Sequence, residues 1–68
     1  MYTLIQIAVM FDARPNDVLE ASGRHITEFE QAAIDAGTTA DRYRLIPLID
    51  DTELPRIAAE LDVIPSSR

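Results

Sequence analysis

The sequence contains no cysteine and no lysine, and among its 68 residues there are one histidine and two glycines. Without cysteine, neither a disulfide framework nor a thiolate metal site can form. A single histidine excludes a histidine-rich metal site, and two isolated glycines exclude a glycine-rich phosphate loop. A chain this short can hardly enclose a ligand pocket of about 300 Å³. We therefore expect no enzymatic activity, no metal or other cofactor, and no small-molecule ligand.

Long apolar runs are also absent, because none approaches the ~18 residues that a membrane-spanning helix needs. The start of the chain, Met1-Tyr2-Thr3, has neither the basic residues nor the small-residue cleavage site of a secretory signal. Together with the lack of cysteine, these features predict a cytoplasmic protein with no membrane partner.

Basic residues are few. Six arginines oppose twelve acidic residues, which leaves a formal charge of −6. The excess is greatest in residues 26–51, where two arginines oppose six acids. Because a nucleic acid presents a dense row of phosphates, this balance disfavours nucleic-acid binding without excluding it.

The length predicts one domain, residues 1–68, with residues 65–68 as a frayed tail. Domains of this size rarely have a net stability above about 3–5 kcal/mol without a disulfide, a metal or an oligomeric contact. Since the first two are not expected here, we expect a protein partner or a homo-oligomer to supply additional stability.

The first expected helix covers residues 4–11. Thr3 and Gln6 have the spacing of a capping box, in which each side chain bonds the other residue's backbone N–H. One face of this helix carries apolar residues at helical spacing, namely Leu4, Ile7, Ala8 and Phe11. Ile5, Val9 and Met10 extend the apolar surface almost around the helix, so we expect another chain to cover part of it.

Three further helices are expected. Pro15 suits the first turn of a second helix, which has Val18, Leu19 and Ser22 as its inner row and a left-handed Gly23 as its end. Thr27 and Glu30 have capping-box spacing for a third helix, which ends at Gly37. Its expected inner stripe is Phe29, Ala32, Ala33 and Ala36. The last helix is capped by Asp51 or Thr52 and buries the stripe Leu54, Ile57, Ala58 and Leu61.

Residues 38–51 do not follow one pattern. Thr39 can cap a short helix, but Pro47 pushes the preceding Ile46 toward extended geometry. We therefore expect a helix that ends near Leu45 and an extended stretch within residues 43–50. The fold class is all-α: a single compact domain of four or five short helices.

A pattern of identical residues recurs at an offset of 50 positions. It consists of Ile7-Ala8, Asp12 and Pro15, and again of Ile57-Ala58, Asp62 and Pro65. Residues 4–22, with a partial echo at 54–68, resemble a helix-turn-helix segment. The sequence departs from that motif at Asp12, where glycine is expected, and at Arg14, where serine or threonine is expected. Residues 4–21 are also similar to the small N-terminal module of bacterial translation initiation factor two.

The helix-turn-helix resemblance implies that the second helix lies against DNA. The DNA contacts would be Arg14, Asn16 and Arg24, with Asp17 and Glu20 also facing outward. The protein would then be a transcriptional regulator that acts as a dimer.

Two groups of residues are candidates for binding a protein partner. The first is the outer apolar face of the first helix, Ile5, Val9 and Met10. The second is Arg42, Tyr43 and Arg44 with Leu48 in the neighbouring apolar segment Leu45–Ile49, because arginine and tyrosine are favoured at binding hot spots. His25 is expected to be a solvated turn residue, and Asp50, Asp51 and Glu53 to be helix-start acids rather than calcium ligands.

Our leading hypothesis is a small acidic, non-enzymatic interaction or assembly module, of a kind that would suit a viral or mobile-element accessory or virion component. The alternatives are the helix-turn-helix regulator and an acidic mimic of DNA that uses residues 26–51 to block a DNA-binding protein.

Overall fold

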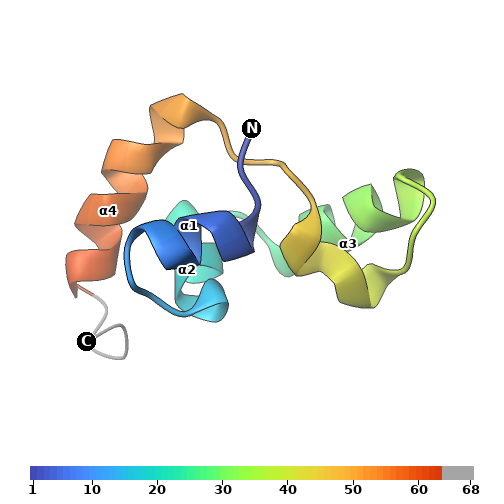
Figure 1. The fold of residues 1–68 in the computed structure, drawn as a ribbon, viewed down its shortest axis with the longest axis horizontal. Helices are drawn as coiled ribbons and strands as arrows, with labels where there is room; N and C mark the ends of the chain where they lie inside the picture. The colour runs from blue at the N-terminus through green and yellow to red at the C-terminus, as the bar shows by residue number, and fades with distance from the viewer. Residues whose placement is uncertain (64–68) are drawn as a thin grey trace.

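The computed structural model describes residues 1–63, which form four α-helices and two 3₁₀-helices (Figure 1). In chain order they are α1 (Leu4–Met10), α2 (Pro15–Ser22), α3 (Ile26–Asp35), η1 (Ala40–Leu45), η2 (Asp51–Glu53) and α4 (Leu54–Val63). The all-α prediction is confirmed. No helix in this part of the chain is long and apolar enough to cross a membrane.

The fold has two parts that lie along its longest axis (Figure 1). At one end α2 packs against both α1 and α4, and at the other end η1 packs against α3. One cluster of buried side chains includes residues from both parts. Its members are Leu4, Ile7, Ala8, Val18, Ala21, Phe29, Ile49, Ile57 and Leu61.

Helix α1 begins with the expected capping box. The Gln6 N–H donates to Thr3 Oγ1 at 3.0 Å, and the Thr3 N–H donates to Gln6 Oε1 at 2.9 Å. Leu4, Ile7 and Ala8 face the core, as their spacing predicted, whereas Phe11 is the helix cap and is only partly buried. The helix therefore buries one stripe and leaves its opposite face uncovered.

The turn between α1 and α2 is set by Asp12, whose φ of 53° lies in the left-handed region. The Ala13 N–H donates to the Ala8 carbonyl at 2.8 Å, and the Asp12 N–H donates to the Val9 carbonyl at 3.4 Å. This pair of bonds is the Schellman arrangement that ends many helices. Asp12 thus adopts the conformation that glycine would adopt with less strain.

Helix α2 starts at Pro15 and ends at a left-handed Gly23, as predicted. Val18 and Ser22 are buried as expected, but Ala21 completes the inner face and Leu19 is only partly buried. Asp17 does not face outward as expected: it is 7% exposed and is among the buried polar residues.

Helix α3 begins earlier than predicted. The Thr27–Glu30 capping box is wrong, because His25 is the cap and its N–H donates to Glu28 Oε2 at 3.0 Å. The two pairs have the same spacing, so local sequence could not choose between them. The Arg24 N–H is bonded to Ser22 Oγ, and the chain becomes helical again two residues later, at Ile26. Ala36 is exposed as the helix cap, so the buried stripe ends at Ala33.

The segment after α3 follows the prediction in outline. Thr39 precedes η1, and Ile46 is extended at φ −93° and ψ 122°. Tyr43 to Leu45 are helical, so extended chain begins only at Ile46, within the predicted range of 43–50. Asp50 caps η2, where Asp51 or Thr52 was expected, and its N–H donates to Glu53 Oε2 at 3.1 Å. The predicted frayed tail at 65–68 lies outside the described residues.

An antiparallel bridge joins the first residues to this extended segment. The Tyr2 N–H donates to the Ile49 carbonyl at 2.8 Å, and the Tyr2 carbonyl accepts from the N–H groups of Leu48 and Ile49. A hydrogen bond to Asp51 raises the pKa of Tyr2. The bridge brings the chain that follows η1 beside the start of α1.

The strain at Asp12 makes a testable prediction. Asp12→Gly should raise the free energy of unfolding by about 0.5–1 kcal/mol, because glycine adopts the left-handed region without a Cβ clash. Asp12→Ala keeps the Cβ and should not stabilise. Urea denaturation followed by circular dichroism measures both variants. Equal stabilities for the glycine and alanine variants would contradict this account.

Candidate interaction surface

The outer face of α1 is apolar and uncovered. Val9 is 79% exposed and Ile5 is partly exposed, one helical turn apart, and Leu45 at the end of η1 is 54% exposed. Ile5 lines two surface hollows of about 310 and 360 Å³. The apolar side chains that line them include Ile5, Val9, Ala13, Pro15 and Leu45, which we call the α1 groove.

The groove exists because α1 faces the core on one side only. Leu4, Ile7 and Ala8 point inward, so Ile5 and Val9 must point the other way on a helix of 3.6 residues per turn. The turn adds Asp12, Ala13 and Pro15 at one end, while η1 adds Leu45 at the other.

Arginines border the groove at the η1 end. Arg42 and Arg44 line the same hollow as Ile5 and Leu45. The Arg44 guanidinium lies over the Tyr43 ring, 5.4 Å from its centroid, and Arg44 Nε donates to the Tyr43 hydroxyl at 3.1 Å. The Tyr43 hydroxyl donates in turn to Asn16 Oδ1 at 3.3 Å, which links η1 to the start of α2.

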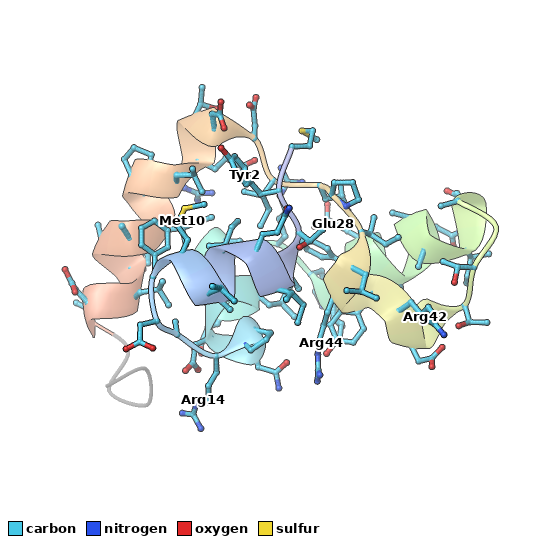
Figure 2. The ribbon with its side chains drawn as sticks, viewed as in Figure 1. Tyr2, Met10, Arg14, Glu28, Arg42 and Arg44 are labelled. Carbon is cyan, nitrogen blue, oxygen red and sulfur yellow. The ribbon has the colours of Figure 1, made fainter. Side chains whose placement is uncertain are left out.

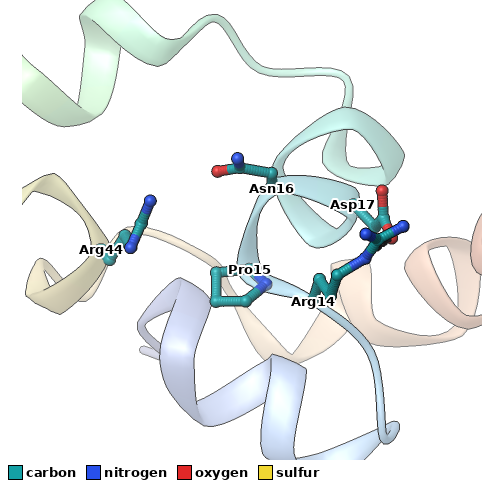
Figure 3. A pocket seen from close by; sticks show the side chains of 5 residues that line it. All are labelled: Arg14, Pro15, Asn16, Asp17 and Arg44. Carbon is teal, nitrogen blue, oxygen red and sulfur yellow. Dashed lines mark hydrogen bonds and ion pairs between the residues drawn. The ribbon is translucent and has the colours of Figure 1, made fainter. Parts of the chain in front are cut away.

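A third hollow of about 410 Å³ adjoins the groove and shares Pro15 and Arg44 with it (Figure 3). Arg44 lies on one side of this hollow, and Arg14 lies with Asp17 on the other (Figure 3). Arg14 Nε is 3.2 Å from Asp17 Oδ2, so the charge of Arg14 is balanced by a buried carboxylate. Asn16 points into the space between them (Figure 3).

The arginines of this protein differ in whether they form ion pairs. Among residues 1–63, Arg14, Arg24 and Arg56 form ion pairs with carboxylates, whereas Arg42 and Arg44 form none. Asp41 lines the hollow beside them, but its carboxylate accepts a hydrogen bond from the Thr39 hydroxyl. This bond, with a smaller contribution from Arg42, lowers the pKa of Asp41.

The structure brings together four of the residues proposed to bind a partner: Ile5, Val9, Arg42 and Arg44. Met10 lies apart from them, on the side of α1 that faces α4 (Figure 2). Tyr43 and Leu48 are partly buried and pack against the core.

Leu45 belongs to the apolar segment Leu45–Ile49, which the sequence suggested as a partner surface, and it lines the groove. Ala13 also lines the groove, and the sequence analysis did not single it out. Leu48 follows Pro47 in the extended segment and packs toward the core instead.

Arg24 does not face outward, contrary to the expectation for a DNA contact. Its Nη2 is 2.9 Å from Glu53 Oε2, and its Nε is buried without a hydrogen-bond partner. Arg56 is 3.5 Å from the other Glu53 oxygen and donates to the Ser22 carbonyl at 2.9 Å. The three charged residues thus join the C-terminal end of α2 to the start of α4. The dipole of α2 also favours cations near its C-terminal end.

The Arg24–Glu53 pair makes a prediction about pH. The hydrogen bond from Arg24 lowers the pKa of Glu53 below its usual 4.5. The pair therefore stabilises the fold fully above that value, and the stabilisation is lost as the pH falls through the folded-state pKa. Glu53→Gln should lower the free energy of unfolding at pH 7 by about 1–2 kcal/mol.

Thermal or urea unfolding at several pH values measures this effect. The difference between wild type and Glu53→Gln should shrink below the usual glutamate pKa. Glu60→Gln, at an exposed carboxylate of α4, makes the same change of charge and should have little effect. A Glu53→Gln difference that is constant from pH 7 to pH 2 would contradict the ion-pair account.

No group of three or more histidine, aspartate or glutamate side chains within residues 1–63 is placed to hold a metal ion. The candidate site is therefore the α1 groove with its two arginines at the η1 end. Comparison with family models, with curated proteins and with solved structures gave no match for this chain.

Proposed function

We propose that this protein is a non-enzymatic interaction module that binds another polypeptide in the α1 groove. The observation that carries the proposal is the joining of exposed apolar side chains from α1 and η1 at two hollows that share Ile5. Exposed apolar residues scattered singly are common on soluble proteins, whereas a continuous hollowed patch is typical of a binding surface.

Covering the exposed apolar side chains of the groove would contribute to the free energy of binding. Full burial of a valine or leucine side chain contributes about 1.5–3 kcal/mol. Val9 and Leu45 are both more than half exposed, and a partner that covers them would gain much of this free energy. The groove also lies on helices that are held by the core, so little ordering is needed when a partner binds.

The charges favour a protein partner over DNA. Arg14 and Arg24, the cations expected to face DNA from α2, are each paired with a carboxylate. The remaining exposed side chains of α2 include Asn16 and Glu20, which do not supply the phosphate contacts that dominate DNA affinity.

A matched pair of variants tests the proposal. Val9→Gln removes an apolar side chain from the groove, and Val63→Gln changes an equally exposed valine, 71% exposed, on α4. Random 14-residue peptides displayed as a library are selected on the wild-type protein, and the self-association of each variant is measured by sedimentation equilibrium.

We expect either selected peptides or a self-associated form, and in both cases a loss of affinity of about tenfold in Val9→Gln and less than twofold in Val63→Gln. Circular dichroism confirms that each variant is folded. A monomer that selects no peptide, or binding that is equal in the two variants, would overturn the proposal.

A further inference from the structure

We infer that the occupant of the α1 groove is an acidic amphipathic segment of another protein, whose carboxylates pair with Arg42 and Arg44. This inference rests on the proposed function and adds to it the chemistry of the partner. It depends on the apolar floor of the groove and on the two arginines without ion pairs.

The floor of the groove fits an apolar side chain beside a charged rim. Ile5 and Leu45 line one hollow together with both arginines, and Ile5 also lines the neighbouring hollow with Val9 and Pro15. Helix α1 has seven residues and so extends about 10 Å. A helical segment with apolar residues one turn apart can occupy both hollows, as in other helix-in-groove complexes.

The two arginines lack the partners that the other cations have. In a chain with twelve acidic residues, the three other arginines that the structure describes are paired with carboxylates. Within residues 1–63 neither Arg42 nor Arg44 forms such a pair, and both are exposed beside Ile5 and Leu45, in a hollow that Asp41 also lines. A carboxylate of a partner would complete these sites, because the planar guanidinium matches a carboxylate with two parallel hydrogen bonds.

Arg44 is already positioned for this role. Its stacking on Tyr43 and the bond from its Nε to the Tyr43 hydroxyl restrict the side chain, and Asn16 holds that hydroxyl. The terminal nitrogens of the guanidinium make no ion pair within the described chain. Restricting a long side chain before binding reduces the entropy lost when the partner arrives.

Outside the groove, residues 1–63 expose no second apolar helical face that could fill it. Outside the groove, the large apolar residues that are exposed among residues 1–63 are single ones on separate parts of the fold, namely Met1, Met10, Ile34 and Val63. None of these supplies two apolar residues one turn apart. A head-to-head contact of two grooves, with their α1 helices parallel, would bring Arg42 and Arg44 of both copies together, and like charges at an interface repel.

Three synthetic helical peptides of 14 residues test the inference. They share one leucine face and carry glutamate, glutamine or lysine on the other face. Binding to the full chain is measured by fluorescence anisotropy at about 50 mM and 500 mM salt. We expect the glutamate peptide to bind about tenfold more tightly than the lysine peptide at low salt, and the difference to narrow at high salt as screening increases.

Variants locate the effect. The double variant Arg42→Gln/Arg44→Gln should weaken binding of the glutamate peptide about three- to tenfold and change binding of the glutamine peptide less than twofold. Arg56→Gln also removes a cation, but one that lies on α4 and pairs with Glu53, away from the groove. This variant should keep the preference for the glutamate peptide. Melting curves confirm that the variants are folded.

Each other outcome overturns the inference. Peptide binding that depends on Val9 but not on peptide charge would support the proposed function and contradict the inference that the partner is acidic. Self-association that Val9→Gln abolishes, without peptide binding, would make a second copy the occupant. Tight binding of a labelled oligonucleotide that the double arginine variant abolishes would assign Arg42 and Arg44 to phosphate. A monomer that binds none of the peptides would contradict both proposals.

Discussion

The backbone bridge between Tyr2 and Ile49 is the constraint on which the candidate site depends. The backbone N–H groups of Leu48 and Ile49 both donate to the Tyr2 carbonyl, and the Ile49 side chain is fully buried in the core. The bridge brings the chain after η1 against the start of α1, and Ile5 and Leu45 then line one hollow. Without this contact, Leu45 and the arginines of η1 would not be held beside Ile5 of α1.

The few cations of this acidic chain have two structural uses. Arg24 and Arg56 meet at Glu53 and join α2 to α4, and Arg14 neutralises the buried Asp17. Arg42 and Arg44 stabilise no such joint within residues 1–63, and they border the groove instead. Because long-range interactions between exposed charges are screened over about 8 Å at physiological salt, these two local cations can attract a carboxylate despite the net charge of −6.

Local sequence correctly predicted those helix ends that are set by residues close to them in the chain. The Thr3–Gln6 box, the start of α2 at Pro15 and its end at Gly23 involve residues three or fewer positions apart or one special backbone conformation. The same reasoning failed at α3, since the spacing of His25 to Glu28 equals that of Thr27 to Glu30. It also failed at Asp50, because a 3₁₀-turn precedes α4. The helix-turn-helix resemblance remains a prediction.

The sequence alone determined the helical class, the start of α1, both ends of α2 and the surplus of apolar residues on α1, since these follow from contacts within one or two helical turns. It named Ile5, Val9, Arg42 and Arg44 as separate candidates, but it could not place them on one surface. Only the tertiary structure decided that Leu45 joins them, that Tyr43 and Leu48 pack against the core, and that Arg24 pairs with Glu53. The reason is physical: these contacts join residues that lie far apart in the chain, and their geometry depends on how the whole core packs.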